Sequence, residues 1–272
     1  MDMFCSHAFR GAIMAAAIVT AGGAEAAPII FAASGDITAT VDAFRAALGA
    51  NNGNVAGSQA GGRREISWDG GGAAAPATVF GNPMTTFASR GNINTTPGTG
   101  LEISGQPSPE FGEINPTYPD IFQTFSAPRL FAPIGSNIVD VLFNIPGDAT
   151  TPAVSRGFGA VFTDVDLADV TTLEFFAQDG SFLREAFVPT ADEGLSFLGV
   201  IFDEPQPVIG RVRITLGNSA LGPNDGGGVD VAALDDFIFG EPQAVAVPEP
   251  SALAVLGFGL VGAMLLGRRR WL

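Results

Sequence analysis

Cysteine, histidine and lysine are almost absent from this sequence. It has one cysteine, Cys5, one histidine, His7, and no lysine, so all 13 basic residues are arginines. Beyond residue 7 the chain therefore cannot form a disulfide, a thiolate or imidazole metal site, a Cys–His pair or a Schiff base. These absences exclude many catalytic mechanisms, and we predict that the chain is not an enzyme.

Positive charge and polar aromatic side chains are also scarce. The 28 acidic residues outnumber the basic ones and give a net charge of −15. Nucleic acid requires a basic surface, so we predict no nucleic-acid partner. The aromatic residues are 22 Phe but only two Trp and one Tyr. Trp68 is therefore expected in the core rather than as a platform for sugars.

The N-terminal segment has the pattern of an export signal. Arg10 precedes an apolar stretch over residues 11–23, and Ala24-Glu25-Ala26 has the small residues of a cleavage site. We predict a signal peptide over residues 1–26, which would remove Cys5 and His7 on export.

The C-terminal segment is apolar and short. As a helix, residues 252–266 would extend roughly 22 Å at about 1.5 Å per residue, less than the roughly 30 Å of a bilayer core. Pro248 and Pro250 prevent a longer regular helix, and the basic cluster at 268–270 predicts a cytoplasmic end. We predict one transmembrane helix at about 251–267. A permanent anchor and a glycolipid-anchor signal are alternatives that fit this pattern less well.

The order of these C-terminal features resembles the PEP-CTERM sorting signal of Gram-negative, exopolysaccharide-producing bacteria. The resemblance rests on a Pro-Glu-Pro motif, a short apolar span and a terminal arginine cluster, that is, on Val247, Pro248, Glu249, Pro250, Arg268, Arg269 and Arg270. It implies an exosortase as processing protease for residues 247–272. It also implies an inner-membrane stage before processing, followed by the cell surface or the extracellular space.

Residues 27–246 are expected to form one extracellular, all-β domain. Apolar spacing predicts one short helix over residues 38–49. Alternation over residues 63–71, which we expect to be the first strand, places Arg64, Ile66 and Trp68 on one face. Residues 73–120 are rich in loop-forming residues, with brief apolar pieces such as 101–104.

The second half of this region has clearer strand signals. Apolar runs separated by turn residues predict six or seven strands in 135–147, 156–169, 171–189, 195–203, 209–217 and 229–242. Asp179-Gly180 predicts a hairpin. The pattern indicates an antiparallel, jelly-roll-like β-sandwich. Its sequence also resembles uncharacterised PEP-CTERM proteins in stretches such as "GFGAVFTDVD" and "ALDDFIFGEP", which implies a β-sandwich and no known catalytic residue.

Two groups of aspartates are candidate metal ligands. Asp164, Asp166 and Asp169 form a D-x-D-x-x-D pattern at a strand end, where calcium would relieve carboxylate repulsion. Asp235 and Asp236 are the second group. Because neighbouring residues of a strand face opposite ways, at most one is expected to point inward, with Arg211, Arg213 or a cation as partner. Solvated aspartates and a structural ion pair are the alternatives. The loop at 222–230 is either a cation loop or a plain hairpin.

These features favour an exported envelope or matrix protein with a structural or adhesive role. The alternatives are a calcium-dependent carbohydrate-binding module and a glycosidase that uses two carboxylates. The expected partners are an exosortase, the inner membrane at least transiently, and exopolysaccharide or matrix components. Calcium is the one cofactor that the sequence suggests.

Overall fold

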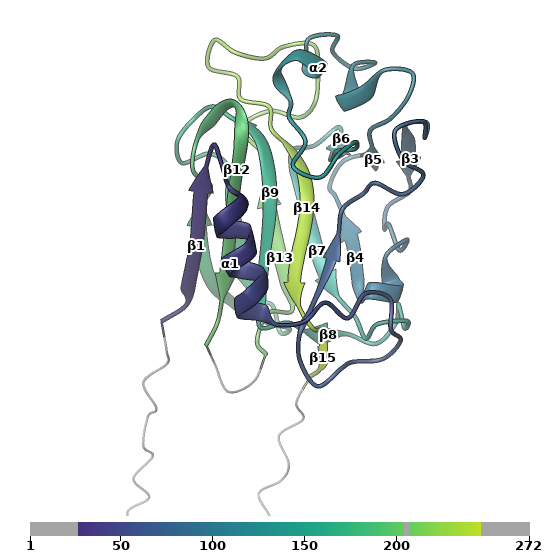
Figure 1. Cartoon of the computed structure of the whole chain (residues 1–272), viewed down its shortest axis with the longest axis vertical. Helices are drawn as coiled ribbons and strands as arrows, with labels where there is room; N and C mark the ends of the chain where they lie inside the picture. The colour runs from purple at the N-terminus through teal and green to yellow at the C-terminus, as the bar shows by residue number, and fades with distance from the viewer. Residues whose placement is uncertain (1–26, 204–206, 246–272) are drawn as a thin grey trace, which may run out of the picture.

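The computed structural model describes residues 27–203 and 207–245 (Figure 1). The predicted signal peptide, transmembrane helix and sorting motif lie outside these residues. Within them, no helix has the length and apolar character needed to cross a bilayer.

Two antiparallel sheets form the framework of the described chain. The larger sheet has eight strands, seven of which lie in this spatial order: β1 (Ile29–Ser34), β12 (Ala191–Ile201), β9 (Gly157–Val165), β14 (Ala233–Gly240), β6 (Phe131–Ile134), β5 (Gly100–Ile103) and β3 (Thr78–Phe80). The eighth strand, β2 (Arg63–Ile66), pairs with β14. The smaller sheet contains, in order, β11 (Phe182–Phe187), β10 (Thr172–Phe176), β13 (Arg211–Thr215), β7 (Ile138–Phe143) and β4 (Asn92–Thr95).

Short elements complete the described chain. They are α1 (Thr38–Leu48), α2 (Tyr118–Ile121), the 3₁₀ turns η1 (Ala88–Arg90) and η2 (Pro109–Phe111), and a small ribbon of β8 (Ala153–Val154) with β15 (Gln243–Ala244). Of these, α1 is the predicted helix, and α2 is an additional single turn.

The strands of the second half are divided between the two sheets. β6, β14, β9 and β12 adjoin one another in the larger sheet, whereas β7, β13, β10 and β11 adjoin one another in the smaller one. The antiparallel sandwich predicted from strand spacing is therefore confirmed.

The main core lies between the sheets. Phe158 on β9 and Phe239 on β14 meet Phe143 on β7, with ring centroids 6.3 and 5.5 Å apart. Trp68 is buried in the same core and stacks on Phe131 at 4.0 Å, as expected for a core residue. Alternation on β2 is also confirmed, because Arg64 and Ile66 are buried there with Trp68 just beyond.

Helix α1 covers the outer face of the larger sheet (Figure 1). Its buried side chains Val41, Phe44 and Leu48 pack on residues of β9, β12 and β14. Every residue of β9 is consequently buried, since the second sheet covers one face and the helix covers the other. This is the reason that β9 reads as a nearly continuous apolar run.

The strands predicted in the second half are present, and the Asp179-Gly180 turn joins β10 to β11 as expected. The first half differs from the prediction. Strand β1 precedes the helix, so residues 63–71 are not the first strand. Strands β3, β4 and β6 lie among residues read as loops or left unassigned. Strands β3, β4 and β6 have only three or four residues, too few to show a clear period between turn residues.

The two ends of the described chain lie at the same end of the sandwich, at the bottom of Figure 1. β1 begins there, and β15 lies there too. The end of β9, the start of β12 and the start of β14 lie at the opposite, upper end, because these neighbouring strands are antiparallel.

Candidate functional site

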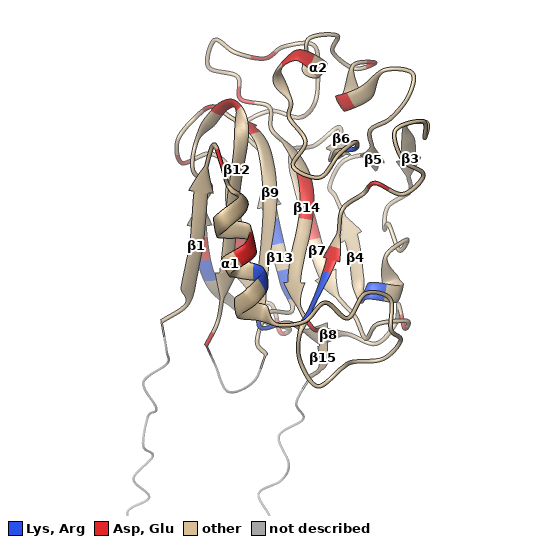
Figure 2. Ribbon diagram, viewed as in Figure 1, with Lys and Arg blue, Asp and Glu red and all other residues tan. Residues whose placement is uncertain are grey.

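The upper end of the sandwich carries a group of acidic side chains. Figure 2 shows several acidic positions in the loops there, whereas the arginines lie mostly lower in the molecule. The oxygen atoms of Asp164, Asp166 and Asp225 lie within 4.8 Å of one another. These residues come from the end of β9 and from the loop before β14, so tertiary folding brings them together. We call these three residues the acidic cluster.

The end of β9 has an unusual backbone that helps to form this cluster. Asp164 has a φ of +62°, a left-handed conformation that aspartate tolerates better than most residues. Its Oδ1 accepts a hydrogen bond from the backbone N–H of Glu193 at 2.8 Å. The register of β12 against β9 shifts between Ala191 and Leu195 at the same level. Thus a bulge at the start of β12 holds the Asp164 side chain.

Asp164 is buried and Asp166 and Asp225 are partly buried, and no positive charge among the described residues compensates the cluster. Burial, followed by the charges of neighbouring acids, raises the pKa of Asp164 to about 7 and that of Asp166 to about 6. Burial also raises the pKa of Asp225 and of nearby Asp230. Across residues 27–203 and 207–245, no arginine forms a salt bridge with the cluster.

Several carboxylate oxygens near the cluster have no hydrogen-bond donor. Asp164 Oδ2, Asp166 Oδ1 and Asp230 Oδ1 are each buried without a partner among the described residues. Such oxygens are suitable ligands for a hard cation such as calcium, which takes six to eight oxygen ligands. The described chain has no histidine or cysteine, so zinc and copper lack their usual ligands.

The predicted residues of the first group do not all meet. Asp164 and Asp166 lie together, but Asp169 is exposed, has a φ of +62° and does not belong to the cluster. Asp225 takes the third position. It lies in the 222–230 loop, for which a cation-binding role was one of two interpretations, but its closeness to Asp164 could not be read from local spacing.

Asp235 and Asp236 on β14 form a separate site with different neighbours. Both are buried, whereas the alternation of a regular strand places at most one inward. The pairing of β14 with β9 shifts register between Leu234 and Phe237, and α1 with the segment 123–129 covers the outer face. The irregular strand and this cover together explain the double burial.

The partners of this second pair also differ from the expected ones. Arg45 of α1 reaches Asp236 Oδ2 at 3.2 Å, and the N–H groups of Phe125 and Ser126 donate to Asp235 Oδ2 at 2.6 and 3.1 Å. Arg211 and Arg213 instead bind Asp140 within the smaller sheet. The prediction of Arg211 or Arg213 as partner is therefore wrong, because they lie on the other sheet.

Ser126 lies between three carboxyl groups. Its Oγ lies 2.6 Å from Asp236 Oδ1, 2.9 Å from Asp69 Oδ2 and 3.1 Å from Asp235 Oδ1. A hydroxyl group donates only one proton, so the other two contacts are hydrogen bonds only where a carboxyl group supplies the proton. Burial and the neighbouring Asp236 charge raise the pKa of Asp235 to about 9, in agreement with this geometry.

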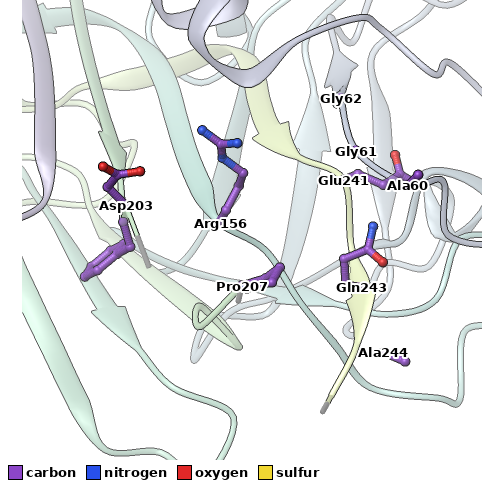
Figure 3. Close-up of a pocket in the computed structure, with 10 residues that line it drawn as sticks. Ala60, Gly61, Gly62, Arg156, Asp203, Pro207, Glu241, Gln243 and Ala244 are labelled. Carbon is purple, nitrogen blue, oxygen red and sulfur yellow. The ribbon is translucent and has the colours of Figure 1, made fainter. Parts of the chain in front are cut away.

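A hollow of about 460 Å³ lies at the lower end, near the last described residues (Figure 3). Arg156, Asp203 and Gln243 line it, together with Glu241. Glu241 is already bound by Arg64, through contacts of 2.8 and 2.6 Å, so this acid serves the structure. The hollow thus adjoins a buried ion pair.

Comparison with known proteins adds to this description. The fold defines the chain as an antiparallel β-sandwich protein with an acidic upper end. Residues 246–270 match the PEP-CTERM protein-sorting motif, directly after the last described residue. The chain thus carries the sorting signal that its C-terminal pattern predicts, and this motif implies an exported protein that an exosortase sorts.

Two further comparisons do not identify a relative of known function. No curated protein matches the sequence. A solved structure of a mutant family 29 carbohydrate-binding module, studied for ligand recognition, matches at 12% identity and a TM-score of 0.27, covering 64% of this chain and 97% of its own. A score this low supports no conclusion about ligand or function.

Proposed function

We propose that this chain is an exported protein of the cell surface or extracellular matrix, with a structural or adhesive role carried by its β-sandwich. The observation that carries the proposal is the PEP-CTERM motif at residues 246–270, which follows β15 without an intervening domain. On this proposal residues 1–26 direct export, and an exosortase removes the C-terminal segment after the inner-membrane stage.

The arrangement of the sandwich supports this role. Both ends of the described chain lie at the lower end, so a membrane-attached tail would leave the upper end facing away from the membrane (Figure 1). The acidic cluster lies at that upper end. The surface that meets other matrix components would therefore be acidic, and it would repel nucleic acid and anionic lipid.

Processing and location test the proposal together. The full chain is expressed in an exosortase-containing host, and the mature protein is analysed by fractionation and by mass spectrometry of both termini. We expect surface or extracellular protein that begins near Ala27 and has lost Arg268–Arg270. Replacing Pro248, Glu249 and Pro250 by alanine should leave uncut protein in the inner membrane, because the exosortase no longer recognises its site.

The matched control is Pro207→Ala, which changes a proline outside the motif and should be processed as the wild type is. Intact wild-type protein in the cytosol would refute the proposal. Unchanged processing of the triple variant would refute the assigned motif residues.

A second candidate function is carbohydrate binding, favoured by the outer face of the smaller sheet. Phe182 on β11 is 59% exposed and meets Phe176 at 5.9 Å. The Arg211 guanidinium lies 4.0 Å from the Phe176 ring. Exposed aromatic rings beside hydrogen-bond donors can stack against sugar rings. Trp68, which the sequence analysis expected in the core rather than as a platform for sugars, is buried.

Binding of the host exopolysaccharide, measured with and without chelator, tests this candidate. Phe182→Ala should weaken binding severalfold, and Val79→Ala, which removes an equally exposed apolar side chain on β3, should not. Equal binding by wild type and Phe182→Ala would exclude this face.

The glycosidase alternative finds less support in the site. The closely paired carboxyl groups Asp235 and Asp236 are buried, and they are already in contact with Ser126 and Arg45. We therefore propose a non-enzymatic role. Release of sugar from any glycan by the purified protein would contradict it.

A further inference from the structure

We propose that Asp164, Asp166 and Asp225 bind a calcium ion at the upper end of the sandwich. This inference goes beyond the proposed function, because the site could bind calcium whether or not the protein is structural or adhesive.

The first argument is the convergence of negative charge. The three carboxylates approach within 4.8 Å although Asp225 lies far along the chain from the other two. Asp192 at the start of β12 and Asp230 before β14 add their charges to Asp166. No arginine in the described part of the chain neutralises the cluster. Carboxylates held this closely repel one another unless a cation lies between them.

The second argument is independent of charge and concerns hydrogen bonds. Asp164 is only 2% exposed, and its Oδ2 has no donor among the described residues. Asp230 is fully buried, and its Oδ1 likewise lacks a donor. A buried polar atom without a partner is costly and uncommon in proteins. A cation bound by Asp164 would satisfy the oxygen that the protein leaves unpaired.

The ordered contacts around the cluster leave these oxygens available. Asp164 uses Oδ1 for the N–H of Glu193, and Asp230 uses Oδ2 for the N–H of Leu167. In both residues one oxygen fixes the side chain and the other remains free. Calcium accepts carboxylates in one- or two-oxygen contacts and completes its shell with backbone oxygens or water. Its irregular geometry suits ligands from separate loops better than the strict octahedron of magnesium does.

Calcium titration of the full chain in detergent tests the inference, using calorimetry and thermal melting after treatment with chelator. We expect one calcium ion per chain at this site and a higher melting temperature when calcium is added. Asp225→Asn should weaken calcium binding at least tenfold, because it removes one charged ligand. Asp225 lies in a partly exposed loop, and the melting curve of the variant measures its folding directly.

Two further variants sharpen the test. Asp166→Asn should melt at a higher temperature than wild type in chelator, since it relieves repulsion, while losing the calcium response. This opposite pair of effects distinguishes a ligand from a merely structural residue. Asp120→Asn is the matched control, since Asp120 is an exposed aspartate of α2 at the same end of the molecule.

The outcomes separate the possibilities. Loss of calcium binding in Asp225→Asn and Asp166→Asn, with normal binding in Asp120→Asn, supports the site. Three results would overturn it: a melting temperature unmoved by calcium and chelator, unchanged binding in Asp225→Asn, or equal weakening by Asp120→Asn, which would indicate general attraction to an acidic protein.

Discussion

Ser126 shows how one residue can set the protonation of its neighbours. Its hydroxyl contacts Asp69, Asp235 and Asp236 within 3.1 Å, while Arg45 contacts Asp236 and Glu65. These groups belong to α1, the β2 region, β14 and the 123–129 segment. The charge of Arg45 therefore links α1 to the larger sheet, and the hydroxyl of Ser126 links the 123–129 segment to it.

The raised pKa of Asp235 predicts how stability depends on pH. In the folded chain Asp235 keeps its proton up to about pH 9, whereas the unfolded chain loses it near the ordinary aspartate pKa of about 4. Between these values the folded state binds more protons, so stability falls as pH rises, by up to about 1.4 kcal/mol per pH unit for one proton. Urea unfolding at pH 5, 7 and 9 should show this decline.

Asp235→Asn is the matched variant for this prediction. The amide keeps the size of the side chain and an oxygen that can accept from the N–H of Phe125, but it does not titrate. The free energy of unfolding should therefore fall less between pH 5 and 9, because about one proton fewer is linked to unfolding. An equal decline in the variant would show that another group carries the pH dependence. Burial also raises the pKa of Asp236, so Asp236 would then be the next residue to replace.

At the scale of elements, α1 docks on the larger sheet through a pair of glycines. Gly159 on β9 lies opposite Gly199 on β12, and the ring of Phe44 lies directly over both. A Cβ atom at Gly199 would lie 2.7 Å from Phe44 Cε2, and one at Gly159 would lie 2.9 Å from Phe44 Cε1. The two glycines thus form the groove that accepts the aromatic side chain of the helix.

This packing predicts the effect of adding one methyl group. Gly199→Ala should destabilise the protein by about 1–3 kcal/mol, because overpacking forces Phe44 or the sheet to move. Chemical denaturation measures the change. Gly70→Ala is the control, since nothing lies within 4 Å of the added atom. In the Phe44→Leu background the cost of Gly199→Ala should shrink, and an undiminished cost would argue against the contact.

At the scale of the whole molecule, the described residues carry their own cores. The main core joins both sheets, and smaller clusters lie under α1 and beneath the 111–122 segment. Both described ends lie at the lower end, so export and sorting segments attach on one side (Figure 1). The folding of the sandwich should not depend on either segment.

A fragment of residues 27–245 tests this independence. We expect it to be expressed in a folded form and to unfold in a single cooperative transition, because the two sheets share one core. Calorimetry compares the measured enthalpy with the van't Hoff enthalpy. Two separate transitions would contradict the single shared core. A fragment that does not fold would contradict the proposed domain boundaries.

The second half of the fold could be predicted from the sequence better than the first half. Long apolar runs such as β9 and β14 are visible because both faces of these strands are buried. The hairpin at Asp179-Gly180 depends on local turn chemistry and was also predictable. Strands β3, β4 and β6 have only three or four residues, and pairing with other strands rather than local preference defines them.

The sequence by itself determined the fold class, the helix, the sorting motif and the absence of histidine, cysteine and lysine chemistry from the described chain. These features depend on composition or on residues close together in the chain. Only the tertiary structure decided that Asp225, rather than Asp169, joins Asp164 and Asp166, and that Ser126 and Arg45 contact Asp236. The physical reason is that strand pairing brings together loops far apart in the sequence, and local spacing contains no record of that pairing.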